Sequence, residues 1–253
     1  MPEYPTELIE AIIDNFAKKK RTDTVLDIGY GGGQATFDLA LHFKQVLAWD
    51  FDIDILELAD ERIRKEKIKN IKLEQKSEEN ITELKDESLK LVVVAQSLHD
   101  IDGEKFFSVI IPKISPGGGI AIISGGFIAP DGIFGRKILE ERDRVLSKVV
   151  KKYIRVSNKK VEKSMENVNK KDYTTMLADA GFSDISDDIY EQEIERSTDQ
   201  IIGWLYANQL FAKDKFGQKS GKFEKELTKK LKSLSPNGVF IEKARFTLIM
   251  AKK

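Results

Sequence analysis

The sequence predicts an α/β fold: one mostly parallel sheet of seven strands with helices on both of its faces. Short, continuously apolar runs such as TVLDI (24–28) and LKLVVVAQ (89–96) are typical of strands buried on both faces. The segments between these runs carry apolar residues three and four positions apart, which is typical of amphipathic helices. Strands and helices that alternate in this way favour a parallel sheet covered on both sides.

The expected elements alternate up to Ser124 and then lose that rhythm. The first helix is expected to have Thr6 as its cap, and Gly181 is expected to end a later helix. The expected strands are 24–28, 45–50, 71–76, 89–96, 120–124, 185–194 and 240–253. The expected helices are 6–19, 34–43, 53–67, 103–113, 133–152, 171–181, 198–213 and 221–233. We interpret the extra helices as insertions, at about 126–170 and 197–235, into a single domain of residues 1–253.

The composition excludes several classes of function. The chain has 42 Lys and Arg residues and 42 Asp and Glu residues, and this balance argues against a nucleic-acid partner. The chain has no cysteine, which removes disulfides, thiolate metal sites and cysteine nucleophiles, and no metal site is expected. No apolar run is long enough to span a membrane, and the N-terminus lacks the order of a signal peptide. We therefore expect a cytoplasmic protein with no membrane partner.

The stretch VLDIGYGGG (25–33) concentrates four of the 17 glycines directly after the first strand. Glycine is needed where a tight strand-to-helix turn passes close to a ligand, although a turn without a ligand would also use it. A dinucleotide fingerprint, G-x-G-x-x-G, fails because its third glycine position is Gln34. The pattern is instead an acidic residue followed by glycines at every second position: Asp27, Gly29, Gly31 and Gly33.

This pattern resembles the first motif of the class I S-adenosylmethionine-dependent methyltransferases. The resemblance implies a Rossmann-like sheet of seven strands with the last strand antiparallel, a cofactor-binding half at 1–125 and helical insertions that form a lid. It implies that the loop, including Tyr30, holds the methionine part of S-adenosylmethionine, that Asp27 orients this part, and that S-adenosylhomocysteine is the product.

The next motif is an acidic residue at the end of the second strand. Asp50 stands there, 17 residues beyond Gly33, and a carboxylate can accept hydrogen bonds from both hydroxyls of a ribose. Asp50 resembles the family's ribose ligand, and Phe51 resembles the apolar residue that packs on the adenine. The alternative is that Asp50 only helps to cap the helix at 53, a role that Asp52 or Asp54 also suits.

The later strands extend the resemblance. Ser77 aligns with an aspartate that contacts the adenine in the family, so Ser77 or Glu78 is expected to take over that contact. VVVAQSLHDI (92–101), with Gln96 as a further cofactor residue, and the phrase SPGGG before the fifth strand both resemble the small-molecule branch. YPTELIEAI (4–12) resembles the start of trans-aconitate-type relatives. The chain as a whole is similar to this small-molecule branch, which includes trans-aconitate and ubiquinone-biosynthesis methyltransferases.

The acceptor is expected to be a small molecule, methylated on oxygen or carbon. Methylation of pyrimidine carbon in the family uses a cysteine, and DNA amine methylation uses a proline-containing loop after strand four; the chain has neither feature. His99 follows strand four and is a candidate general base, or else a wall of the pocket. The expected acceptor contacts are the aromatic residues Phe127, Trp204 and Tyr206. Two alternatives stay open: a cofactor-binding protein without catalysis, and an RNA or protein methyltransferase that uses the lysines of 159–171.

Overall fold

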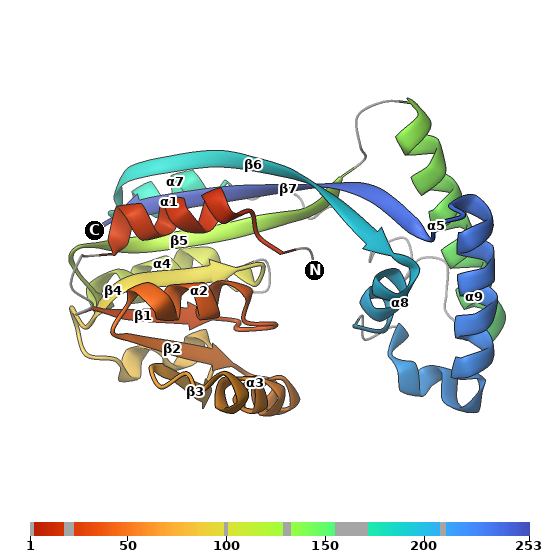
Figure 1. The fold of residues 1–253 in the computed structure, drawn as a ribbon. Helices are drawn as coiled ribbons and strands as arrows, with labels where there is room; N and C mark the ends of the chain where they lie inside the picture. Colours follow the sequence, from red (N-terminus) through yellow and green to blue (C-terminus); the bar gives the residue numbers. More distant parts are fainter. Residues whose placement is uncertain (1–2, 18–22, 99–100, 129–132, 155–171, 208–210) are drawn as a thin grey trace. The chain divides into compact units, whose positions relative to one another are not determined.

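The computed structural model describes residues 3–17, 23–98, 101–128, 133–154, 172–207 and 211–253 (Figure 1). The chain divides into two compact units. The sheet unit consists of Glu3–Gly125, Lys170–Glu191 and Arg245–Lys253, and the helical unit consists of Met1–Pro2, Gly126–Asn169 and Gln192–Ala244.

The strands form one seven-stranded sheet in the order β3-β2-β1-β4-β5-β7-β6. Their bounds are β1 Thr24–Ile28, β2 Gln45–Asp50, β3 Ile71–Gln75, β4 Leu89–Ala95, β5 Ile114–Ile128, β6 Ser183–Ser197 and β7 Val239–Lys252. The four pairs among β1 to β5 are parallel, and β7 runs in the opposite direction between β5 and β6 (Figure 1). The predicted fold class, with its antiparallel last strand, is confirmed.

Five helices of the sheet unit follow the predicted ranges: α1 Thr6–Phe16, α2 Gln34–His42, α3 Ile53–Glu66, α4 Gly103–Ile110 and α7 Tyr173–Asp179. Short 3-10 helices add η1 Glu78–Glu83 and η3 Ile111–Lys113. The predicted cap of the first helix is wrong: Pro5 is the N-cap, and its carbonyl accepts the N–H groups of Leu8 and Ile9 at 3.1 and 3.4 Å. The helix therefore starts one residue earlier than the side-chain signal indicates. Gly181, with φ +97°, follows the end of α7 as expected.

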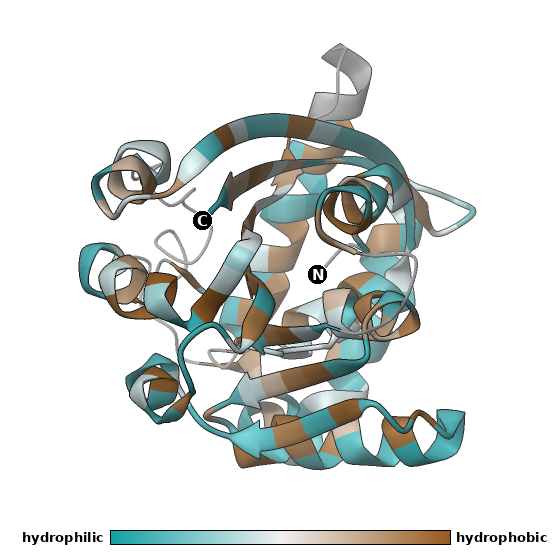
Figure 2. Cartoon of the chain, turned by 90° about the vertical axis from the view of Figure 1, so that its left-hand side faces the viewer, coloured by the Kyte–Doolittle hydropathy of each residue, from teal (hydrophilic) through white to brown (hydrophobic). Residues whose placement is uncertain are grey.

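The core of the sheet unit forms because the central strands are apolar on both faces. Every residue from Leu89 to Val94 on β4 is buried, and residues from β1, β5 and α4 pack against this strand. Figure 2 shows the apolar residues on the strands and on one side of the flanking helices. The helical unit has a core of its own, built from α5 Ile133–Tyr153, α8 Thr198–Ala207, η5 Lys213–Lys219 and α9 Ser220–Leu234.

The strand order reverses between β1 and β4, because β1 is followed on one side by β2 and on the other by β4. Ligands of open α/β sheets bind outside the carboxyl ends of the strands at such a reversal. Both the glycine loop after β1 and Gln96 after β4 lie at this place in the topology. The fold thus brings together two stretches that the sequence separates by more than 60 residues.

Among the residues described above, no helix combines the length and the hydropathy needed to span a membrane. The same residues contain no group of three or more His, Asp and Glu side chains that could hold a metal ion.

Candidate functional site

The loop between β1 and α2 has a backbone that only glycine adopts easily. Gly29, Gly31 and Gly33 have φ angles of +74°, +52° and +69°, in the left-handed region where a Cβ crowds the neighbouring carbonyl. Gly33 is also the N-cap of α2. The alternation of glycines in the sequence is therefore a requirement of this backbone.

The glycines differ in what lies beside them. A Cβ at Gly29 would lie 2.6 Å from the Cβ and Oγ of Ser97, whose hydroxyl donates to the carbonyl of Ile28 at 2.9 Å. A Cβ at Gly33 would collide with the ring of Tyr30. Beside Gly31, in contrast, the nearest atom is the carbonyl oxygen of Gly29 at 3.8 Å. The loop is therefore packed against protein at Gly29 and Gly33 and open at Gly31, where a ligand can approach the backbone.

Asp50, at the end of β2, is tied directly to this loop. One carboxylate oxygen accepts the N–H of Gly31 at 2.9 Å, and the other accepts the N–H of Asp52 at 3.0 Å. Asp52, not Asp50, is the N-cap of α3, and it accepts the N–H of Asp54 at 3.0 Å. The capping alternative for Asp50 is therefore wrong. Since each carboxylate oxygen has a second lone pair, Asp50 keeps capacity for two more donors.

Phe51 follows Asp50 and is 77% exposed. Large apolar side chains are usually buried, because exposing a phenyl ring to water is unfavourable. Covering the ring with another flat group would release water from both surfaces. The position therefore suits the packing of a flat, apolar ring.

Ser77 and Glu78 lie beyond the end of β3, the strand next to β2. Ser77 is the N-cap of η1: its hydroxyl oxygen accepts the N–H of Glu79 at 3.3 Å, and its own N–H donates to Asn80 at 3.1 Å. The hydroxyl proton of Ser77 is left to donate, whereas an aspartate at this place would have only acceptors.

Asp27 is buried, 2% exposed, and is only half satisfied by hydrogen bonds. One carboxylate oxygen accepts the hydroxyl proton of Thr36, and the other has no partner among the described residues. Burial raises the pKa of Asp27 to about 6, the hydrogen bond from Thr36 opposes this rise, and the charge of Asp50 adds to it. A buried carboxylate oxygen without a partner, beside an open loop, suits a cationic donor.

Gln96 lies at the end of β4 with a φ of +61°, which is uncommon for a residue with a Cβ. Its backbone N–H donates to Ile123 at 2.8 Å, but its side-chain Nε2 is buried without a partner in the described part of the chain. A strained backbone and an unsatisfied amide donor on one residue are typical of a functional site.

Tyr4 was not among the predicted site residues. Its ring meets Phe246 edge-on at 5.2 Å. Burial raises the pKa of the Tyr4 phenol above its ordinary value, and the negative charge of Asp27 raises this pKa further. Tyr4 thus belongs to the surroundings of Asp27. The sequence feature that could have indicated Tyr4 is the YP dipeptide near the N-terminus. The distance along the sequence between residues 4 and 27 predicts no contact between them.

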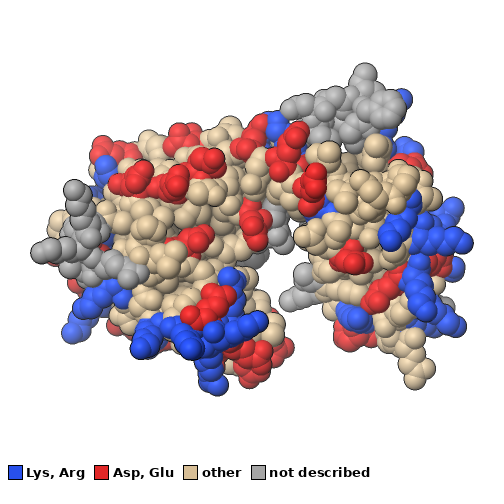
Figure 3. Space-filling model, viewed as in Figure 1, with Lys and Arg blue, Asp and Glu red and all other residues tan. Residues whose placement is uncertain are grey.

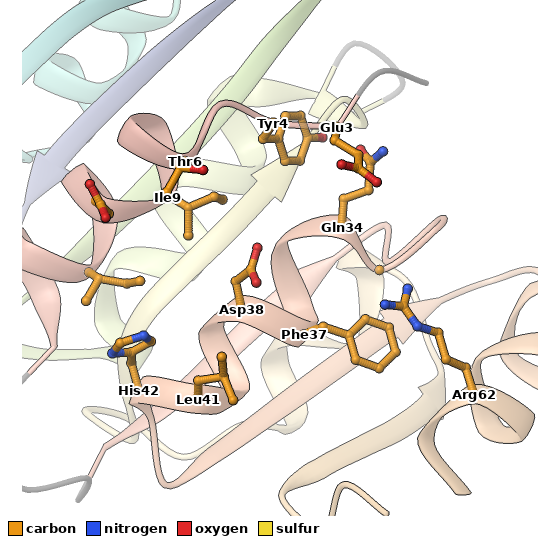
Figure 4. A pocket seen from close by; sticks show the side chains of 13 residues that line it. Glu3, Tyr4, Thr6, Ile9, Gln34, Phe37, Asp38, Leu41, His42 and Arg62 are labelled. Carbon is orange, nitrogen blue, oxygen red and sulfur yellow. The ribbon is translucent and has the colours of Figure 1, made fainter. Parts of the chain in front are cut away.

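A pocket of about 450 Å³ lies beside the loop, between α1 and α2 (Figure 4). Ile9 of α1 and Leu41 of α2 line its two walls, and Asp38 points into the space between them. Gly33 is the one predicted site residue in its lining. The pocket therefore adjoins the loop but is not the place where the predicted residues meet.

The predicted acceptor residues belong to the helical unit. Phe127 and Trp204 share one neighbour, because the guanidinium of Arg196 lies 4.5 Å from the first ring and 5.4 Å from the second. Tyr206 differs: its hydroxyl donates to Glu224 at 3.1 Å, and its ring packs in the core of the unit. His99 lies outside the described residues.

Tyr30 is a buried residue of the loop that packs against its neighbours. It is 6% exposed, its N–H donates to the carbonyl of Trp49 at 3.1 Å, and its ring meets Phe37 at 6.4 Å. Its carbonyl accepts the N–H of Gly33 at 2.8 Å, which closes the turn.

Known proteins resemble this chain in sequence and in fold. The model of a family described as "Methyltransferase domain" matches residues 19–195. The chain is 30% identical over 110 residues to the protein of Saccharomyces cerevisiae named "Probable S-adenosylmethionine-dependent methyltransferase CRG1". That segment is 43% of this chain and 37% of the yeast protein, and a Dictyostelium discoideum relative matches at 33% identity over 127 residues, 50% of this chain and 45% of that one. The chain spans less than half the length of the curated relatives it matches.

Solved structures share the fold. The YcgJ protein of Bacillus subtilis superposes with a TM-score of 0.55 at 14% identity and covers 98% of this chain and 99% of its own. Geranyl diphosphate C-methyltransferase of Streptomyces coelicolor, solved with geranyl diphosphate and S-adenosylhomocysteine, has a TM-score of 0.53 at 15% identity and covers 98% and 78%. At these identities the likeness concerns the fold.

Proposed function

Since the chain belongs to the methyltransferase-domain family, whose cofactor is S-adenosylmethionine, we propose that it transfers the methyl group of this cofactor to a small organic molecule. Oxygen or carbon is the accepting atom, and S-adenosylhomocysteine is released. The proposal is carried by one observation: the carboxylate of Asp50 holds the N–H of Gly31 at 2.9 Å while the space beside Gly31 stays open.

The residues around the loop fit the cofactor group by group. The ribose hydroxyls donate to the remaining lone pairs of Asp50, and the adenine packs on the exposed ring of Phe51. The hydroxyl proton of Ser77 and the carboxylate of Glu78 are available at the adenine end.

The amino-acid part of the cofactor lies along Gly29–Gly33 in this proposal. Its ammonium group supplies the donor that the free oxygen of Asp27 lacks, and its carboxylate accepts from Nε2 of Gln96. Two buried groups that are unsatisfied in the described chain thereby gain partners of the right charge and hydrogen-bonding type. A pyrophosphate at the loop would instead bring negative charge toward the unsatisfied oxygen of Asp27, which disfavours a dinucleotide.

The methyl group is already activated by the sulfonium that carries it, so the protein's contribution is to bind, align and exclude water. Alignment of two reactants in a site contributes up to about 7–11 kcal/mol in favourable cases. A general base adds about 10²–10⁴-fold where the acceptor must lose a proton, and His99 is the residue proposed for that role.

A small acceptor is supported by charge and by the aromatic pair. The whole chain balances 42 Lys and Arg residues against 42 Asp and Glu residues, although on the face shown in Figure 3 Lys and Arg side chains gather in the lower part of the sheet unit. Nucleic-acid binding proteins usually carry an overall surplus of positive charge instead. Phe127 and Trp204, held around one arginine, are the residues proposed to contact the acceptor.

The test is a transfer assay with labelled methyl donor. The protein is incubated with a small-molecule extract and S-adenosylmethionine labelled in its methyl group, and the label is followed into the small-molecule fraction. We expect incorporation that depends on the protein and that falls at least tenfold with Asp50→Ala at limiting cofactor. Label in the RNA or protein fraction alone would replace the proposed acceptor class, and label nowhere, despite cofactor binding, would leave a cofactor-binding protein without catalysis.

A further inference from the structure

The helical unit contains a buried carboxylate that serves two arginines. Glu242 of β7 is 1% exposed, and its two oxygens accept from different partners: Arg142 of α5 and Nη1 of Arg196 of β6, the latter at 3.1 Å. The side chains of these arginines are only 12% and 9% exposed. A buried charge is stable only when it is paired and hydrogen-bonded, so Arg196 depends on Glu242, whereas Arg142 also donates to Asp143 at 2.8 Å.

Arg196 is held by two hydrogen bonds and lies beside two aromatic rings. Its Nη2 donates to the carbonyl of Gln200 at 3.3 Å, in addition to the bond from Nη1 to Glu242. The rings of Phe127 and Trp204 lie 4.5 and 5.4 Å from the guanidinium carbon. A guanidinium held by two hydrogen bonds has a defined position, and aromatic rings that pack against the cation are held relative to it.

The cluster is distinct from the core of its unit. That core consists of apolar side chains such as Leu146, Phe223 and Phe240, and it includes neither Phe127 nor Trp204. Both rings are only partly buried, whereas the ion pair that orients them is buried. Buried hydrogen bonds that hold partly exposed side chains in one geometry are typical of residues that support a binding site.

We propose that Glu242 is a positioning residue for the acceptor: it fixes Arg196, and Arg196 fixes the rings of Phe127 and Trp204 that contact the acceptor. This proposal rests on the proposed function for the role of the rings, but the geometry of the cluster can be tested without any substrate. Glu242 itself touches no reactant.

Two variants test the cluster: one changes Glu242 and the other changes Arg196. Glu242→Gln keeps the size of the side chain but removes the charge that both arginines share. Arg196→Lys keeps the charge and loses the plane, so it leaves Glu242 paired and secures the test if Glu242→Gln fails to fold. The matched control is Glu226→Gln, because Glu226 also accepts from two side chains in this unit, Lys152 at 2.6 Å and Tyr153 at 2.8 Å, without touching Arg196.

The first readout is tryptophan fluorescence. Trp204 is one of two tryptophans; the other, Trp49, is fully buried in the sheet unit and is common to all variants. We expect Glu242→Gln and Arg196→Lys to shift the emission to longer wavelength and to raise acrylamide quenching about twofold, with Glu226→Gln unchanged. Emission and quenching that stay as in the wild type in both cluster variants would overturn the positioning role.

The second readout separates acceptor binding from cofactor binding. With labelled S-adenosylmethionine and a serially diluted metabolite extract, both cluster variants should need at least tenfold more extract for half-maximal incorporation. Their maximal rate should stay within about threefold, and their affinity for S-adenosylmethionine within about twofold. A loss that also appears in Glu226→Gln would show a general loss of stability and overturn the proposal. A wild-type protein that transfers no methyl group would overturn the proposed function, whatever the fluorescence reports of the cluster.

Discussion

Two aspartates of the sheet unit have opposite surroundings, although both lie next to the same loop. Asp50 has a donor on each oxygen, from Gly31 and from Asp52. Asp27 has a donor on one oxygen only, and burial raises its pKa to about 6 from 3.8. Asp50 is therefore satisfied before any ligand binds, while Asp27 holds a charge that is costly until a cation arrives.

This cost leads to a prediction for Asp27→Asn. A carboxyl whose pKa is raised on folding stabilises the protein fully below its unfolded pKa, about 4, and this contribution is lost as the pH rises through about 6. At pH 8 the charged Asp27 therefore costs roughly 3 kcal/mol, from a difference of about two pKa units. Asp27→Asn should unfold at higher urea concentration than the wild type at pH 8, with little difference at pH 4.5, and should bind S-adenosylmethionine more weakly.

Urea unfolding of both proteins at the two pH values measures this effect. Asp52→Asn is the control, since Asp52 is an exposed cap whose change should cost a similar small amount at both pH values. A stability difference between Asp27→Asn and the wild type that is the same at pH 4.5 and pH 8 would show that Asp27 does not carry the buried charge.

The glycines of the loop give a second prediction at this scale. Gly31→Val places a side chain in open space, so it should cost stability only through its φ of +52°, about 1–2 kcal/mol, and should abolish binding of S-adenosylmethionine. Gly29→Ala drives a Cβ into Ser97 and should cost more stability. Thermal unfolding and calorimetric titration of both variants test this separation; a Gly31→Val protein that folds and still binds would contradict the loop model.

The sequence pattern could predict where Asp27, the three glycines and Asp50 lie in the fold, because each stands at or just beyond the end of a strand that is easily recognised. It could not predict that Ser97 packs against Gly29. That contact depends on the register of β1 and β4, which pairs Ile28 with Val94 across the sheet. Tyr4 was missed for the same reason: its approach to Asp27 is a property of tertiary structure, not of spacing.

At the scale of elements, the strands were predicted well because burial on both faces leaves a continuous apolar run. The fifth strand is an exception. SPGGG was expected to be a connection, but β5 begins at Ile114 and includes it. A Cβ at Gly119 would collide with the carbonyl of Ala251, so this glycine allows the close approach of β7 rather than a turn. The predicted helix 103–113 ends at Ile110 and continues as a 3-10 turn at Pro112, because proline cannot donate to the helical ladder.

The helices that follow β5 were predicted as elements, but their polar contacts were not. Arg142 pairs with Glu242 and with Asp143, the latter at 2.8 Å. Two charges separated by 100 positions have no signature in a single sequence. The charge pattern of α5 indicated an amphipathic helix and nothing about which charges are buried.

At the scale of the whole molecule, strands and helices stop alternating after Ser124, close to Gly126, where the helical unit begins. The helical unit, at 126–169 and 192–244, contains the ranges of about 126–170 and 197–235 that are interpreted as insertions, except for Lys170. β5, β6 and β7 run through these boundaries. In the proposed function, the residues that bind the cofactor belong to the sheet unit and those that contact the acceptor belong to the helical unit.

The most direct test of this account is a calorimetric titration of S-adenosylmethionine into the wild-type protein and into Asp50→Ala. We expect micromolar affinity for the wild type and at least tenfold weaker binding for Asp50→Ala, a loss of about 1.4 kcal/mol or more, with no heat from a nicotinamide dinucleotide. Equal affinity of the two proteins for S-adenosylmethionine, or binding of the dinucleotide in its place, would contradict it.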